Sequence, residues 1–206
     1  MKEWRYYLCL SLLGGSYVVL IVAMVGADLF FTTSESFFST LREPDTRYAI
    51  NLTLISCSVT AILSLWVGVP MGYLLARTQF WGKTIVDTIL DIPIILPPLI
   101  LGLSLLILFN QTQIGVWFQE HLFRVQFEIP AVILAQFSVS AAFAVRTMRI
   151  TFEQTSPRTE QVALTLGCTR SQAFWRVVLP EAWRGVMTAG TLAWARSLGE
   201  FGPILI

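Results

Sequence analysis

Charged side chains are scarce in this 206-residue chain, where they make up only 13% of the residues. A soluble domain carries about 25% charged residues, so this chain has too few polar groups to cover a soluble surface. Apolar residues make up 55%, and the mean hydropathy is +0.67. This composition excludes an ordinary soluble protein and predicts that much of the apolar surface contacts a lipid bilayer.

Groups that carry chemistry are equally scarce. The single histidine, His121, has no ligand partners near it in the sequence, and the three cysteines lie far apart, at Cys9, Cys57 and Cys168. There is no GxxxxGK phosphate-binding loop, so any ATP would have to be hydrolysed by a partner chain. The net charge of +1 provides no field that attracts nucleic acid. We expect no catalytic residues, no metal site, no cofactor bound by this chain and no nucleic-acid partner.

Long apolar segments are what the sequence has instead. A helix needs about 20 apolar residues to cross a hydrocarbon core of ~30 Å. Five segments are candidates, approximately residues 6–25, 49–75, 85–109, 129–145 and 186–206. They predict an all-α, polytopic transmembrane protein in which residues 1–206 form a single transmembrane domain. The sequence stops within an apolar run, and we expect that it is truncated from a longer protein.

The positions of lysine and arginine predict the orientation of these spans. Ten of them lie in the N-terminal segment and in the loops after spans two and four, whereas three lie in the alternating loops. The ten are Lys2, Arg5, Arg77, Lys83, Arg146, Arg149, Arg158, Arg170, Arg176 and Arg184. The other three are Arg42, Arg47 and Arg124. This asymmetry predicts a multi-pass protein whose N-terminus and long loop after span four face the cytoplasm.

The long loop after span four is patterned rather than disordered, and we call residues 153–182 the knob. Ser156 followed by Pro157 is typical of a helix start, because the hydroxyl caps the first amides and proline fixes a helical φ. Gly167 suits the left-handed residue that follows the end of a helix. The first helix of the knob is therefore predicted between Pro157 and Gly167.

A second helix in the knob is predicted by the capping-box spacing of Thr169 and Gln172. We expect it to end at Leu179-Pro180, since proline cannot continue the hydrogen-bonded ladder. Two short rigid helices of this kind offer small and apolar side chains to another protein. An amphipathic segment lying on the membrane, with arginines on anionic lipid, is an equally good interpretation of the residues alone.

The knob also contains a recognisable motif. The triplet Gln161-Val162-Ala163 is followed after three residues by Gly167, and after nine more by Val177-Val178-Leu179-Pro180. This pattern resembles the motif of the binding-protein-dependent ABC importer permeases, which reads Glu-Ala-Ala, three residues, Gly, nine residues, Ile-x-Leu-Pro. The motif glutamate is replaced by Gln161, with Glu160 one position before it. Residues 90–103 and 195–206 are similar to the molybdate/tungstate and sulfate branch of that family.

The resemblance implies the membrane-spanning permease subunit of an ABC importer in the bacterial inner membrane. A separate cytoplasmic ATPase subunit would bind the knob and hydrolyse ATP, and a periplasmic binding protein would deliver the solute. The resemblance also implies a second, identical permease subunit and a small oxyanion as solute, with molybdate or tungstate placed before sulfate. The residues implied in coupling are Glu160, Gln161, Val162, Ala163, Gly167, Val177, Leu179 and Pro180.

Polar and helix-breaking residues inside the spans are candidates for the translocation pathway. They are Pro97, Pro98, Ser138, Ser140, Arg196 and Glu200. The prolines, together with Pro93, interrupt span three, which suits a helix that lines a cavity and equally a packed kink. The two serines, with Gln136, are also interpreted as polar contacts between helices. Arg196 and Glu200 are four residues apart and form either part of a gate or a packing ion pair.

Two acidic residues at the start of span three have a separate interpretation. Asp87 and Asp91 share one helical face, where both would repel an oxyanion. We therefore expect them to pair with Arg77 or Lys83 near the membrane interface instead of contacting the solute.

Other functions stay open from the residues alone. Permeases for phosphate and polyamines share the coupling motif, although the scarcity of intramembrane acids disfavours a polycation. An ion-coupled secondary transporter would need intramembrane carboxylates, for which Glu200 is the single candidate. A membrane-embedded enzyme would need a catalytic cluster at one membrane face, and the sequence offers none.

Overall fold

The computed structural model describes residues 2–31, 34–113, 115–117 and 129–199. Every regular element among these residues is a helix, which confirms the predicted all-α class. The chain divides into two compact units, Met1–Asn51 and Leu52–Ile206. The first unit holds α1 (Lys2–Phe31), α2 (Ser34–Arg42) and the start of α3 (Pro44–Arg77).

Helix α1 is apolar on all sides. Its stretch Tyr6–Phe31 is long and apolar enough to cross a membrane, as predicted for the first span. Large side chains such as Leu13 and Val22 are exposed along it. A helix without a polar face needs an apolar environment, because exposing such a surface to water is unfavourable.

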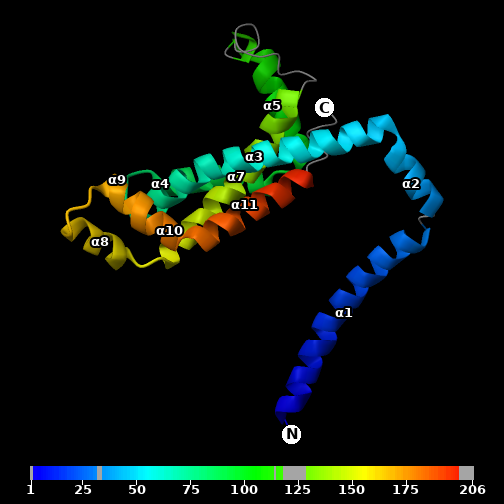
Figure 1. Cartoon of the computed structure of the whole chain (residues 1–206), viewed down its shortest axis with the longest axis horizontal. Coiled ribbons are helices and arrows are strands. Elements are labelled where there is room, and N and C mark those ends of the chain that lie inside the picture. The colour runs from blue at the N-terminus through cyan, green and yellow to red at the C-terminus, as the bar shows by residue number, and fades with distance from the viewer. Residues whose placement is uncertain (1, 32–33, 114, 118–128, 200–206) are drawn as a thin grey trace. The chain divides into compact units, whose positions relative to one another are not determined.

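The second unit is built on a layer of three helices, α3, α7 (Ile129–Gln154) and α11 (Trp183–Leu198), which lie side by side (Figure 1). Helices α3 and α7 approach closely at Gly68 and Gly72, one turn apart. A Cβ atom placed at Gly72 would lie 2.6 Å from the Cβ atom of Met148 and 2.8 Å from the amide nitrogen of Arg149. Small residues four positions apart allow such close packing of helices in a membrane.

Helix α11 packs on this layer through small residues at four-residue intervals. Gly185 lies against Thr151 of α7, so that a Cβ atom there would overlap the threonine side chain. Ala189, Ala193 and Ser197 follow on the same face, and all three are buried. This face of α11 is therefore held by close backbone contact rather than by large interlocking side chains.

Span three is broken, as the prolines predict. Helix α4 (Lys83–Ile95) and helix α5 (Pro98–Gln111) meet at Leu96 and Pro97, which have extended backbone, and the two helices are bent by 114°. Pro93 lies inside α4 without ending it. The break therefore falls at Pro97, where one helix ends and the next begins.

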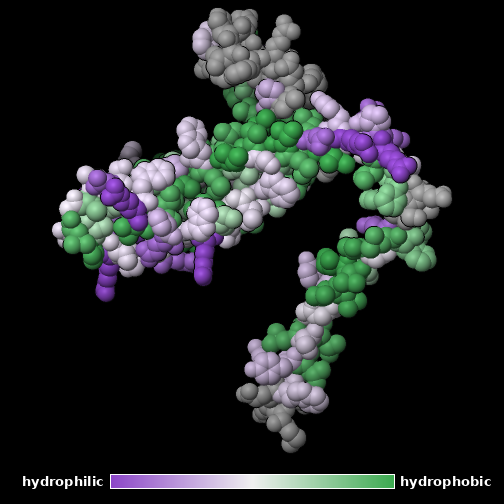
Figure 2. Space-filling model, viewed as in Figure 1, coloured by the Kyte–Doolittle hydropathy of each residue, from purple (hydrophilic) through white to green (hydrophobic). Residues whose placement is uncertain are grey.

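The described helices account for four of the five predicted spans. Three single helices are long and apolar enough to cross a membrane, namely Tyr6–Phe31, Pro44–Arg77 and Pro130–Gln154, and the pair α4–α5 gives a fourth if it forms one broken span. The fifth predicted span begins within α11, and its last residues, 200–206, lie outside the described part of the chain. Hydrophobic side chains cover the middle of the second unit, whereas strongly hydrophilic ones gather at the end that carries the knob (Figure 2).

The knob begins as predicted. The hydroxyl of Ser156 accepts a hydrogen bond from the Arg158 amide at the start of α8 (Pro157–Thr165). Gly167 has a φ of 90°, and the amides of Gly167 and Cys168 donate to the carbonyls of Leu164 and Ala163. This is the glycine-terminated arrangement that satisfies the last carbonyls of a helix.

The second knob helix begins as predicted but ends later. Thr169 and Gln172 form both hydrogen bonds of a capping box at the start of α9 (Arg170–Ala173). The helical backbone then continues through a π-helical turn, η1 (Phe174–Val178), and α10 (Leu179–Glu181). The expectation that Leu179-Pro180 ends this helix is therefore wrong. The π-helical turn shifts the Leu179 amide to the Phe174 carbonyl, five residues back. The wider turn makes room for the Pro180 ring, which in a regular α-helix would clash with the carbonyl four residues before it.

Candidate functional site: the knob and its attachment to the membrane helices

The outer face of the knob consists of the exposed side of α8 and the glycine turn that follows it. Val162 and Leu166, one turn apart, are 57% and 80% exposed. Gln161 and Gly167 are exposed beside them. This face combines two apolar side chains, a neutral amide and a glycine, so a protein surface can approach it closely without displacing a charge.

The inner face of α8 is buried. Ala163 is only 6% exposed, and Ala173 of α9 and Val178 of η1 are fully buried. The motif residues therefore fall into two groups by exposure. The exposed ones are Gln161, Val162, Gly167 and Pro180. Ala163 is buried, and Val177 and Leu179 are partly buried. The structure therefore does not place Ala163 on the outer face of the knob.

An aromatic cluster lies beneath the knob. The ring of Tyr73, near the end of α3, packs edge-on against Phe152 of α7 at 5.5 Å and against Phe174 of η1 at 4.8 Å between ring centres. These contacts join two membrane helices and the second knob helix. Edge-to-face pairs of this kind contribute about 0.5–1.5 kcal/mol each beyond the buried area.

Glu160, on the inner side of α8, pairs with two residues of α3. The Tyr73 hydroxyl donates a hydrogen bond to Oε1 of Glu160, and Nε of Arg77 lies 3.7 Å from Oε2. Nη2 of Arg77 also donates to the backbone oxygen of Thr155, at 2.9 Å, in the connection between α7 and α8. The side chains of Arg77 and Glu160 are only 12% and 15% exposed.

A polar seam joins the three helices of the core. Gln136 of α7 accepts a hydrogen bond from Thr60 of α3, at 3.2 Å, and donates to the backbone oxygen of Ser197 of α11, at 3.3 Å. The hydroxyls of Ser140 and Ser197 are 2.9 Å apart. Ser140 is fully buried in this seam, whereas the Ser138 hydroxyl donates to Ala135 of its own helix. The interpretation of Gln136 and Ser140 as contacts between helices is confirmed.

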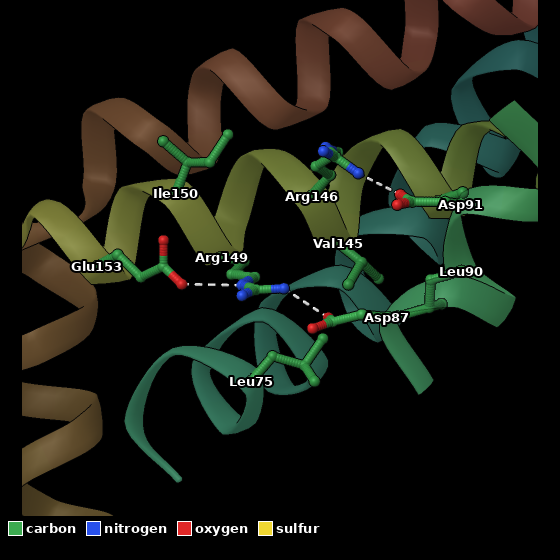
Figure 3. Close-up of a pocket in the computed structure, with 10 residues that line it drawn as sticks. Leu75, Asp87, Leu90, Asp91, Val145, Arg146, Arg149, Ile150 and Glu153 are labelled. Atoms are coloured by element: carbon green, nitrogen blue, oxygen red, sulfur yellow. Dashed lines mark hydrogen bonds and ion pairs between the residues drawn. The ribbon is translucent and has the colours of Figure 1, made fainter. Parts of the chain in front are cut away.

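A pocket of about 350 Å³ lies between α4 and α7. Charged side chains of both signs line it (Figure 3). Arg149 lies between Asp87 of α4 and Glu153 of its own helix and pairs with both, while Arg146 pairs with Asp91.

The expected pairing of the two aspartates with Arg77 or Lys83 is wrong. Helix α7 extends nine residues beyond the predicted span and carries its arginines alongside α4. Arg77 instead pairs with Glu160, and Lys83 donates to the backbone oxygen of Thr78. Each of the three acids that line this pocket is in an ion pair with an arginine of α7.

The remaining candidates for the translocation pathway lie on different helices. Pro97 lies at the break between α4 and α5, and Pro98 begins α5. The guanidinium of Arg196 lies 5.7 Å from the centre of the Phe143 ring. Its expected partner Glu200 lies outside the described residues, so the predicted ion pair stays a prediction. Within the described part of the chain, no group of three or more His, Cys, Asp or Glu residues is arranged to hold a metal ion.

Sequence reasoning missed two features of the site. The attachment of Glu160 to Tyr73 and Arg77 joins residues more than 80 positions apart, although the four-residue spacing of Tyr73 and Arg77 puts them on one helical face. The four-residue spacing of Gly68 and Gly72 was a second available signal, because two small residues one turn apart are typical of a close helix contact.

Comparison with known proteins gives a consistent result. The family model for the binding-protein-dependent transport system inner membrane component matches residues 68–206. This segment contains the last ten residues of α3, the whole knob and α11. The match therefore covers two thirds of the chain and includes the site.

Individual relatives are similar over most or all of the chain. The molybdate/tungstate transport system permease protein of Pyrococcus abyssi is 31% identical over 100% of this chain and 78% of its own length. The corresponding protein of Thermococcus kodakarensis has the same identity and coverage. A sulfate transport system permease protein of Escherichia coli is 34% identical over 82% of this chain and 61% of its own length.

Proposed function

The chain belongs to the family of binding-protein-dependent transport system inner membrane components, and on that premise we propose that it is the permease subunit of an importer driven by a separate ATPase. Its solute is a small tetrahedral oxyanion, molybdate or tungstate first and sulfate second. The names of the relatives support this class of solute. The N-terminus and the knob face the cytoplasm, a periplasmic binding protein delivers the oxyanion, and two copies of the chain form the path.

The knob is the element that we assign to coupling, and its outer face carries this proposal. Val162, Leu166 and Gln161 are exposed on a helix whose ends are fixed by a capped start and a glycine stop. Apolar groups exposed on such a rigid helix suit a groove in a partner protein, since little order has to be gained on binding. The inward side chain of Ala163 shapes the knob without contacting the ATPase.

The broken span is the element that we assign to the pathway. Leu96 and Pro97 have extended backbone, so the helical ladder is interrupted and carbonyl groups are freed inside span three. In a membrane such groups need protein or water as partners, and a water-filled path for an oxyanion provides water. Ser138 and Arg196 are proposed to lie along the same path, while Ser140 supports it from the polar seam.

The test is capture of the cognate ATPase by the detergent-solubilised permease, followed by oxyanion uptake in proteoliposomes that also contain the binding protein. We expect Val162→Asp to weaken capture by about tenfold or more, the scale of a central interface residue. The matched control is Gln79→Asp, which adds the same charge at an exposed residue of the α3–α4 connection, outside the knob. Equal capture by Val162→Asp and by the wild type would contradict docking through this face. Uptake of another solute in place of the oxyanions would contradict the substrate class.

A further inference from the structure

We propose that Tyr73, Arg77 and Glu160 form a tether that fixes α8 to the last turns of α3 and transmits displacement of the knob to this membrane helix. The proposal rests on the proposed function, because it explains how the motion of an ATPase bound to the knob reaches the membrane. Glu160 is then a positioning residue, and docking belongs to the outward residues beside it.

The contacts of Glu160 distinguish it from its neighbours on α8. One carboxylate oxygen accepts from the Tyr73 hydroxyl, and the other faces Nε of Arg77 at 3.7 Å. The side chain is 15% exposed, whereas Val162, on the same helix, is 57% exposed. A carboxylate that accepts a hydrogen bond from Tyr73, lies beside the charge of Arg77 and has little exposed surface is poorly placed to bind a second protein.

The two α3 residues are themselves held in place. The Tyr73 ring is packed between Phe152 and Phe174, which sets the position of its hydroxyl. Arg77 also bonds the backbone oxygen of Thr155, in the connection that leads into α8. The tether therefore holds both the connection and the first turn of α8, and charge-assisted hydrogen bonds with little exposure are stronger than exposed ones.

Helix α3 is a suitable element to receive this displacement. The tether residues occupy its last two turns, and Gly72, directly before Tyr73, lies in close backbone contact with Met148 of α7. Backbones packed this closely move together, because a small shift would produce overlap. A displacement of α8 therefore acts on the α3–α7 pair as a unit.

The experiment compares Glu160→Gln and Tyr73→Phe with the wild type, in complex with the cognate ATPase and the binding protein. Both substitutions preserve side-chain shape: the amide keeps its size, and phenylalanine keeps the ring in the aromatic cluster. Two quantities are measured, capture of the ATPase and the number of oxyanions taken up per ATP hydrolysed. The control is Glu153→Gln, which removes an exposed carboxylate whose ion pair lies within α7.

We expect both variants to capture the ATPase like the wild type while uptake per ATP falls by about fivefold or more, the lower end of typical coupling between linked sites. Glu160→Asp should recover part of this loss, and Glu153→Gln should show none. Unchanged uptake per ATP in both variants would overturn the tether, and so would loss of ATPase capture in Glu160→Gln. If Glu160→Gln fails to fold, Tyr73→Phe decides by the same criteria. If the wild type itself captures no ATPase, the proposed function fails, and the coupling role of the tether fails with it.

Discussion

The side-chain amide of Gln136 donates a hydrogen bond to the backbone oxygen of Ser197, at 3.3 Å, and so joins the middle of the layer to the last turn of α11. The carbonyl of the same amide accepts from Thr60 of α3. One side chain, 1% exposed, thus links all three core helices. The last turn of α11 contains Arg196, one of the two gate candidates, so the position of this residue depends on the link.

Replacement of Gln136 by methionine is expected to lower the free energy of unfolding by about 1–2 kcal/mol, because Thr60 and the Ser197 carbonyl lose their partner in an apolar interior. Thermal or denaturant unfolding in detergent measures this change. Ser138→Ala is the matched control, since the Ser138 hydroxyl donates to the backbone oxygen of Ala135 in its own helix. Equal stability of the two variants would contradict the role of the seam.

Replacement of Gly72 by alanine is expected to push α3 and α7 apart, because the added Cβ would lie 2.6 Å from that of Met148. Overpacking of this kind costs about 1–3 kcal/mol. The control is Gly14→Ala in α1, where a Cβ atom meets nothing within 4 Å. Unfolding in detergent should show a loss for Gly72→Ala alone, and an equal effect at both positions would contradict the close contact.

Replacement of Gly167 by alanine is expected to loosen the turn between α8 and α9, since its φ of 90° is strained for a residue with a side chain. The loss should be about 1 kcal/mol, and Gly167→Asn should lose less, because asparagine tolerates this conformation better. Hydrogen exchange of the α8 amides reports the loosening directly. Faster exchange with asparagine than with alanine would contradict this explanation.

Replacement of the two α4 aspartates should have unequal effects. Asp87 and its partner Arg149 are 27% and 30% exposed, whereas Asp91 and Arg146 are 38% and 58% exposed. Exposed ion pairs contribute about 0–1 kcal/mol and are screened by salt. Asp87→Asn should therefore destabilise the protein more than Asp91→Asn, measured by thermal unfolding at low and high salt. The reverse order would show that burial does not set the strength of these pairs.

Local patterns of the knob were predictable because their partners lie within a few residues. The capped start at Ser156, the left-handed Gly167 and the capping box of Thr169 and Gln172 each involve hydrogen bonds along one short segment. The end of the second helix was not predictable in the same way. Pro180 predicts a stop, but a π-helical turn before it removes the conflict, and the sequence carries no plain signal for that turn.

The partners of charged residues were less predictable than their positions. Asp87 and Asp91 form ion pairs as predicted, but their partners depend on how far α7 extends and how it is rotated about its axis. Glu160 was identified within the motif region, and its inward direction followed only from the packing of α8 on α3.

The sequence by itself determined that this protein is a helical membrane protein, which apolar segments form its long helices, that the third of these segments is interrupted at a proline, and which family it belongs to. These features depend on composition, on the length of apolar runs and on short motifs, all of which involve residues close together in the sequence. Only the tertiary structure decided which face of the knob is buried, which residues bond to Gln136 and which helices touch at Gly72. Those relationships depend on the rotation and spacing of helices distant in sequence, and the packing of the whole unit sets both.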